Sequence, residues 1–258
     1  MINIMKSQFY QIVRSKFPWY AFITVLSAQI LLYLMPVWMG NEKVTSAGEC
    51  FVSNGFVLMA FPFFFLVMIV GYICGTDFKD KTNCYELMSG HHRHEVYFGR
   101  IVPAALIGGL GTMFLTVIPL ILYGMLYGWG TKVDWGDVVL RLVLLLFPVL
   151  RMVCEFAFIT FLIKNPYIMM GVGYVIFIAI MGMAGTQHSF NAFLGITNSI
   201  LLLNVESWVT YGLGETSNYI YETSLGANVI EQTILASVVF GGAALYLGYV
   251  FFKNNDLN

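Results

Sequence analysis

The sequence predicts an all-α membrane protein with six transmembrane helices. Apolar residues make up 59% of the 258 residues and charged residues only 10%, whereas soluble domains are roughly half apolar and about a quarter charged. The mean hydropathy is +0.77. Long apolar runs alternate with short polar segments, and a run of about 20 residues can cross the hydrocarbon core. The net charge of −1 gives no electrostatic basis for binding nucleic acid.

The first element is an N-terminal amphipathic segment, Ile2–Phe17, in which apolar and basic residues alternate with helical spacing. Its apolar residues are Ile2, Met5, Phe9, Ile12, Val13 and Phe17, and its basic residues are Lys6, Arg14 and Lys16. We expect residues 1–18 to form an interfacial helix on the inner leaflet, with Pro18 turning the chain into the first span.

Six apolar stretches then reach the length of a membrane span. They are Tyr20–Met39, Phe51–Cys74, Ile101–Tyr127, Val138–Ile163, Tyr167–Gly185 and Glu231–Phe252. Several contain proline, which lipid-embedded helices tolerate better than soluble ones. We expect residues 1–258 to form a single transmembrane domain.

The basic residues predict the orientation, because cytoplasmic segments carry an excess of Lys and Arg. One side holds Lys6, Arg14, Lys16, Lys79, Lys81, Arg93, Arg100, Lys164 and Lys253. The opposite loops hold only Lys43 and Lys132. Both termini are therefore predicted to be cytoplasmic.

Segment 186–230 is too long for a turn and too apolar for a simple loop, and it contains no Lys or Arg. We expect it to lie outside. Within it, Phe190–Leu203 is too short to span and predicts a short external or re-entrant helix before the last span.

A polar island, Gly75–Arg100, separates the second and third spans. It carries Phe78, Tyr85, Leu87 and Met88 among charged and polar residues. A short helix with a few exposed apolar residues suits docking into a groove on a soluble partner. The alternative is a solvated loop with a helix lying on the membrane surface.

This layout resembles the permease subunit of ABC-2 type transporters. The local resemblance rests on Gly75-x-Asp77, Lys81-Thr82, Leu87, Ser89-Gly90 and Arg93, followed by Gly99-Arg100. Lys81 stands where the family usually has Gly, and His91-His92 replace its Ser-Arg break.

The resemblance implies a dimer, of this chain or with a related permease, and two ATPase subunits contacted by a cytoplasmic coupling helix. The implied coupling residues are Phe78, Lys81, Tyr85, Glu86, Leu87, Met88 and Arg93. The sequence contains no GxxxxGK[ST] phosphate-binding loop, so we expect ATP and Mg²⁺ on the partner ATPase and no cofactor on this chain. The expected function is ATP-driven export of a hydrophobic or amphipathic molecule, such as an antimicrobial or secreted peptide, across a bacterial plasma membrane.

Two further groups are candidate sites within the spans. Arg151 and Glu155 lie at i, i+4, so they share a helix face and form an intramembrane ion pair that either serves function or holds helices together. A soft apolar surface that suits hydrophobic cargo, or ordinary packing, is formed by Phe61, Phe64, Phe65, Met169, Met170 and Tyr174.

Other functions remain open at this stage. The run His91, His92, His94 and Glu95 predicts solvated or partner-facing side chains, since neighbouring helical positions do not face one another as metal ligands. An intramembrane protease would need aligned reactive groups at membrane depth, for which no motif is present. An ATP-independent channel or carrier would depend on Arg151 and Glu155.

Overall fold

The computed structural model describes residues 2–38, 46–48, 55–79, 82–130, 134–184 and 227–254. Within these residues the chain is built from helices, which confirms the predicted all-α class for this part. The helices are α1 (Ile2–Arg14), α2 (Lys16–Trp38), α4 (Gly55–Lys79), α5 (Thr82–Met88), α6 (Arg93–Tyr127), α7 (Trp135–Ile163), α8 (Pro166–Ala184) and α11 (Ala227–Asn254).

Four of these helices are long and apolar enough to cross a membrane, as expected of a multi-pass membrane protein. They are α4, α6, α7 and α11. In α2 and α8 the apolar parts that qualify are shorter, Lys16–Leu32 and Pro166–Ile176. Each predicted span thus falls on a helix, but the number of six spans remains a prediction.

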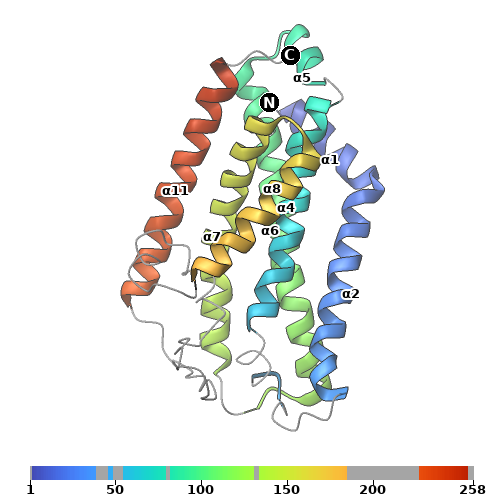
Figure 1. Cartoon of the computed structure of the whole chain (residues 1–258), viewed down its shortest axis with the longest axis vertical. Coiled ribbons are helices and arrows are strands. Elements are labelled where there is room, and N and C mark those ends of the chain that lie inside the picture. Colours follow the sequence, from blue (N-terminus) through green and yellow to red (C-terminus); the bar gives the residue numbers. More distant parts are fainter. Residues whose placement is uncertain are drawn as a thin grey trace.

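The long helices run side by side along the length of the molecule (Figure 1). α4, α6 and α7 pack against one another, α8 packs on α4 and α7, α2 packs on α4 and α6, and α11 packs mainly on α7. α1, α5 and the C-terminal end of α11 lie together at one end of the bundle (Figure 1).

The turn between α7 and α8 shows how local sequence sets these boundaries. Lys164 adopts a left-handed conformation (φ 56°), and its backbone N–H donates to the carbonyl of Thr160, which ends α7. The side chain of Asn165 then accepts a hydrogen bond from the backbone N–H of Tyr167 at 3.0 Å. Pro166 opens α8, because the first helical position needs no N–H donor.

Helices α4 and α8 approach closely beside this turn because Gly75 has no side chain. A Cβ at position 75 would lie 2.9 Å from the Cα of Pro166. Small residues at such contacts allow close packing of membrane helices. Gly75 therefore brings the end of α4 against the start of α8.

The predicted polar island is not a separate segment. α4 continues to Lys79 and α6 already begins at Arg93, so only α5 and two short connections lie between them. The backbone N–H of His92 donates to Glu95 at 3.3 Å where α6 begins. Of the predicted external segment 186–230, only the last four residues lie within the described part, where they begin α11.

The N-terminal helix forms as predicted, but a different face of it is buried. Its buried residues are Ile4, Gln8 and Ile12, which share one face of α1, whereas Ile2 and Val13 are exposed. α1 packs against α6. Gln8 can lie on this buried face because its side-chain amide donates a hydrogen bond to the buried carboxylate of Asp77.

Candidate functional site

The candidate site is the end of the bundle where α5 joins the long helices. Its centre is Arg100 near the start of α6, whose side chain is 0% exposed. Its Nε lies 2.7 Å from Oδ2 of Asp77 at the end of α4, and its Nη2 lies 2.7 Å from Oε2 of Glu86 in α5. One buried guanidinium therefore joins three helices.

Two neutral side chains complete the surroundings of Asp77. The side-chain amide of Gln8 in α1 donates to Oδ2 of Asp77 at 2.8 Å, and the hydroxyl of Thr82 donates to Oδ1 at 2.8 Å. Thr82 is the first residue of α5. Asp77 thus accepts contacts from α1, α5 and α6, and buried carboxylates need such partners.

The cluster contains one cation and two carboxylates. Burial raises the pKa of Glu86, and the negative charge of Asp77 acts in the same direction, while Arg100 opposes the shift. Glu86 is also the more exposed of the two carboxylates, at 22% against 7% for Asp77. The folded protein therefore favours the protonated form of Glu86.

An aromatic cluster lies at the same end of the bundle. The ring of Phe78 in α4 packs edge-on against Phe161 of α7 at 5.6 Å and Phe252 of α11 at 6.3 Å, measured between ring centroids. The buried ring of Tyr97 in α6 lies 4.9 Å from Phe161, and its hydroxyl donates to the carbonyl of Leu245 at 2.9 Å. These contacts join α4, α6, α7 and α11.

Arg93 fixes the C-terminal end of α11. Its Nη1 donates to the backbone carbonyl of Phe252 at 3.4 Å and also to that of Lys253. The last carbonyls of a helix have no partner within the helix, and a basic side chain satisfies them well. Arg93 thus links the start of α6 to the end of α11.

The predicted coupling residues divide into an inward and an outward set. Phe78, Glu86 and Arg93 make the contacts given above, and Leu87 packs against the core. Tyr85 and Met88 point away from the bundle, with 68% and 83% of their surface exposed. Lys81 lies outside the described residues.

The predicted apolar surface lies mostly between α4 and α8. The rings of Phe64 and Tyr174 pack at a tilt of 55° with centroids 5.1 Å apart, and Met169 is fully buried. The rings of Phe61 and Phe64 also touch. Met170 lies close to Gly71 of α4, so it packs at the same interface. In the described structure these side chains pack α4 and α8 together.

Phe65 lies on another side of α4 and faces α2. Its ring meets that of Phe22 edge-on at 5.7 Å. Phe65 also forms one wall of an apolar groove that is lined by the α1–α2 junction and α6.

The predicted ion pair is present in α7. Nε of Arg151 lies 2.7 Å from Oε1 of Glu155, and the guanidinium lies 4.8 Å from the centre of the Phe240 ring in α11. Arg151 is therefore satisfied by its own helix and by the α11 ring, which favours a role in joining α7 to α11.

Three buried residues of the site, Gln8, Asp77 and Arg100, were not among the predicted site residues. Asp77 and Arg100 lie at the polar ends of two apolar runs, which makes an ion pair between neighbouring helices conceivable from the sequence. Arg141 is another buried cation that was not among the predicted site residues. It is 2% exposed, and its Nε lies 2.7 Å from Oδ2 of Asp137.

No protein-family model matches the sequence, and no curated protein shows significant similarity to it. Function must therefore be argued from the layout of the chain and the geometry of the site.

Proposed function

We propose that this chain is the membrane-spanning permease subunit of an ATP-driven ABC transporter. In this proposal six helices (α2, α4, α6, α7, α8 and α11) cross the membrane, and α5 is the cytoplasmic helix that contacts a separate ATPase subunit. The position of α1, α5 and the end of α11 at one end of the bundle supports an even number of crossings (Figure 1).

The observation that carries the proposal is the way α5 is attached. Its Glu86 binds the fully buried Arg100, while its Tyr85 and Met88 are exposed. Burying a charged side chain costs several kcal/mol unless it is well paired. Removing one partner of a buried pair lowers the unfolding free energy by roughly 3–5 kcal/mol. A helix that only covered the bundle end would not need such an attachment.

The attachment gives α5 the mechanical property that coupling requires. A force applied to its exposed face passes through Arg100 to α4 and α6 and through Asp77 to α1. The aromatic cluster around Phe78 and Tyr97 extends this connection to α7 and α11. Closure of an ATPase dimer against α5 would therefore move several helices together.

The cargo belongs to the same proposal. The partly buried side chains between α4 and α8, such as Phe64, Met170 and Tyr174, can repack around substrates of different shape. We therefore infer a hydrophobic or amphipathic cargo, such as an antimicrobial or secreted peptide, that leaves a bacterial cell between two permease protomers.

The test is recovery of the partner. Purification of the tagged chain in mild detergent should recover a P-loop ATPase. Tyr85→Ala and Met88→Ala should reduce this recovery and leave ATP hydrolysis uncoupled from export, because both remove exposed apolar surface from α5. Met125→Ala is the matched control, because Met125 is 78% exposed but lies near the other end of α6.

The result that contradicts the proposal is equally clear. Repeated purification without any ATPase, or equal ATPase recovery and export for all three variants, would exclude α5 as the contact.

A further inference from the structure

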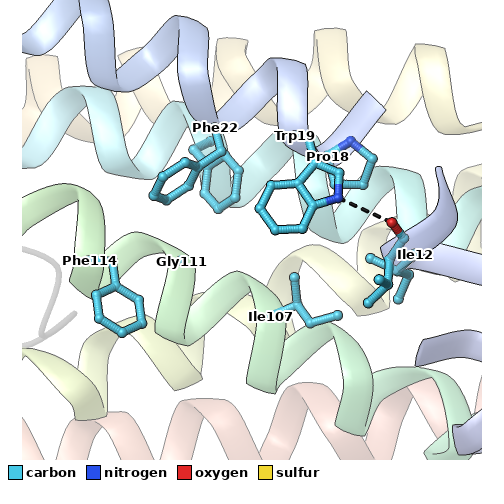
Figure 2. A pocket seen from close by; sticks show the side chains of 9 residues that line it. Ile12, Pro18, Trp19, Phe22, Ile107, Gly111 and Phe114 are labelled. Atoms are coloured by element: carbon cyan, nitrogen blue, oxygen red, sulfur yellow. Dashed lines mark hydrogen bonds between the residues drawn. The ribbon is translucent and has the colours of Figure 1, made fainter. Parts of the chain in front are cut away.

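An apolar groove lies on the side of the bundle where α1 meets α2. It has a volume of about 390 Å³, which is within the range of about 300–1,000 Å³ for small-molecule sites. Its lining residues are all apolar and come from the α1–α2 junction, α4 and α6, as Figure 2 shows. The indole N–H of Trp19 is the one polar side-chain group among these lining residues, and it is already bonded to the carbonyl of Val13, so the lining offers a water-soluble ligand no free polar side chain.

The shape of the groove suits a linear chain. Ile107, Gly111 and Phe114 line it from one face of α6, and seven residues of helix extend over roughly 10 Å. A Cβ at Gly111 would lie 2.5 Å from the ring of Phe65, so glycine at this position leaves room for the aromatic wall. Phe65 is itself held by Phe22.

Two basic residues adjoin the groove in the chain, and one of them, Arg14, donates a hydrogen bond to the hydroxyl of Tyr10 at 2.8 Å. Val13 and Pro18 line the groove, and the exposed residues Arg14 and Lys16 lie between them in the chain. The sequence has no acidic residue before Glu42. Among the described residues, no ion pair involves Arg14 or Lys16. The positive charge at this corner is therefore not neutralised by the described part of the chain.

Exposed aromatic side chains around the α1–α2 corner indicate that this end of the groove lies at the membrane interface. Trp19 is 56% exposed, and its indole N–H donates to the carbonyl of Val13 at 3.1 Å across the α1–α2 corner (Figure 2). Tyr10 and Tyr20 are exposed nearby in the chain. Trp and Tyr gather at the level of lipid headgroups, so this end lies at that level and the groove extends into the hydrocarbon.

We propose that this groove binds an anionic glycerophospholipid, with one acyl chain along Ile107 and Phe114 and the headgroup on Arg14 and Lys16. The proposal rests on the membrane location of the bundle and is independent of the proposed transport function. A second copy of this chain is a poorer occupant, because pairing through the same face would bring two basic corners together.

The test compares two lipids with identical acyl chains. The full-length protein in detergent is titrated with phosphatidylglycerol or phosphatidylcholine, and native mass spectrometry counts bound lipids and protein copies. Because each basic side chain near an anionic headgroup contributes about fivefold in affinity, phosphatidylglycerol should bind about 25-fold more tightly. Combined Arg14→Gln and Lys16→Gln substitutions should remove this preference.

The acyl part is tested separately. Ile107→Phe fills the groove and should abolish binding of the first lipid, whereas the matched control Leu110→Phe, on the exposed face of the same helix, should leave it unchanged. Should Ile107→Phe fail to fold, Phe114→Trp fills the groove from its other end.

Three results would overturn the proposal. They are equal affinity for the two lipids, unchanged lipid binding when the groove is filled, and a second protein copy in place of the lipid.

Discussion

Replacing Arg100 with methionine should release α5 from the bundle. Methionine keeps most of the apolar stem but removes the only cation between Asp77 and Glu86 in the described cluster. The two carboxylates would then face each other without compensation. Asp77 would retain the hydrogen bonds from Gln8 and Thr82, whereas Glu86 has no other cluster contact in the described structure.

The size of the effect follows from burial. Arg100 is 0% exposed and Asp77 is 7% exposed, so loss of the cation should cost about 3–5 kcal/mol of unfolding free energy. At this chain length each kcal/mol lowers Tm by about 2–4 °C, which gives a decrease of about 6–20 °C. Glu86→Gln should cost at most about 1 kcal/mol, because its amide oxygen can still accept from Arg100.

Thermal stability can be followed with a thiol-reactive dye. Cys74 is fully buried in α4, one turn from Asp77, so it reacts only when this region opens. Cys50, Cys84 and Cys154 should be replaced by serine so that the dye reports Cys74 alone. Hydrogen exchange of the α5 amides, residues 82–88, then gives the local reading.

Arg141→Met is the matched control for loss of a buried cation. Arg141 is 2% exposed and pairs with Asp137 at 2.7 Å, but it lies on α7. Both variants should lower Tm, whereas only Arg100→Met should speed exchange in α5. Unchanged α5 exchange in Arg100→Met would refute the attachment of α5 through Arg100.

Three further predictions use the same thermal measurement. A Cβ at Gly248 would collide with the hydroxyl of Tyr97, so Gly248→Ala should cost about 1–3 kcal/mol, whereas Gly242→Ala, with nothing within 4 Å, should not destabilise. Tyr97→Phe alone should cost about 1 kcal/mol through its lost hydrogen bond, yet it should partly rescue Gly248→Ala; a purely additive double variant would contradict the collision. Because the folded state raises the pKa of Glu86 above 4.5, folding favours its protonated form, so its stabilising contribution is complete below pH 4.5 and is lost as pH rises through the raised pKa. Glu86→Gln should therefore gain on the wild type over that interval, and a growing advantage of the wild type there would show the opposite shift.

Apolar periodicity predicts the helices well where they are surrounded by apolar sequence. The predicted spans over α7 and α8 agree with the observed helices to within three residues at each end. The largest difference is at α6, which begins eight residues before the predicted start at Ile101. A hydropathy criterion ends a span at its first charges, but Arg100 pairs internally, so the helix continues through it.

The candidate site is harder to read from sequence because α5 has only seven residues. Two turns of helix are too few for periodicity to separate a buried face from an exposed one. The sequence therefore placed Leu87 and Met88 in one group, although Leu87 packs on the core and Met88 is 83% exposed. Likewise, no local pattern pairs Gln8 with Asp77, because the two residues lie 69 positions apart in the chain.

In α5 the charged side chain faces the bundle and the large apolar side chains face outward. In a soluble surface helix, charges usually face water and apolar residues face the core. Here Glu86 faces inward to a buried cation, while Tyr85 and Met88 face outward. The contact of Glu86 with Arg100 gives α5 a fixed orientation on the bundle, since a fully buried cation tolerates little displacement of its partners before its desolvation cost is no longer offset. The exposed apolar face then remains free to bind by area burial. An element that binds a moving partner and transmits its motion needs both properties, and this division between them supports the proposal that α5 is a coupling helix.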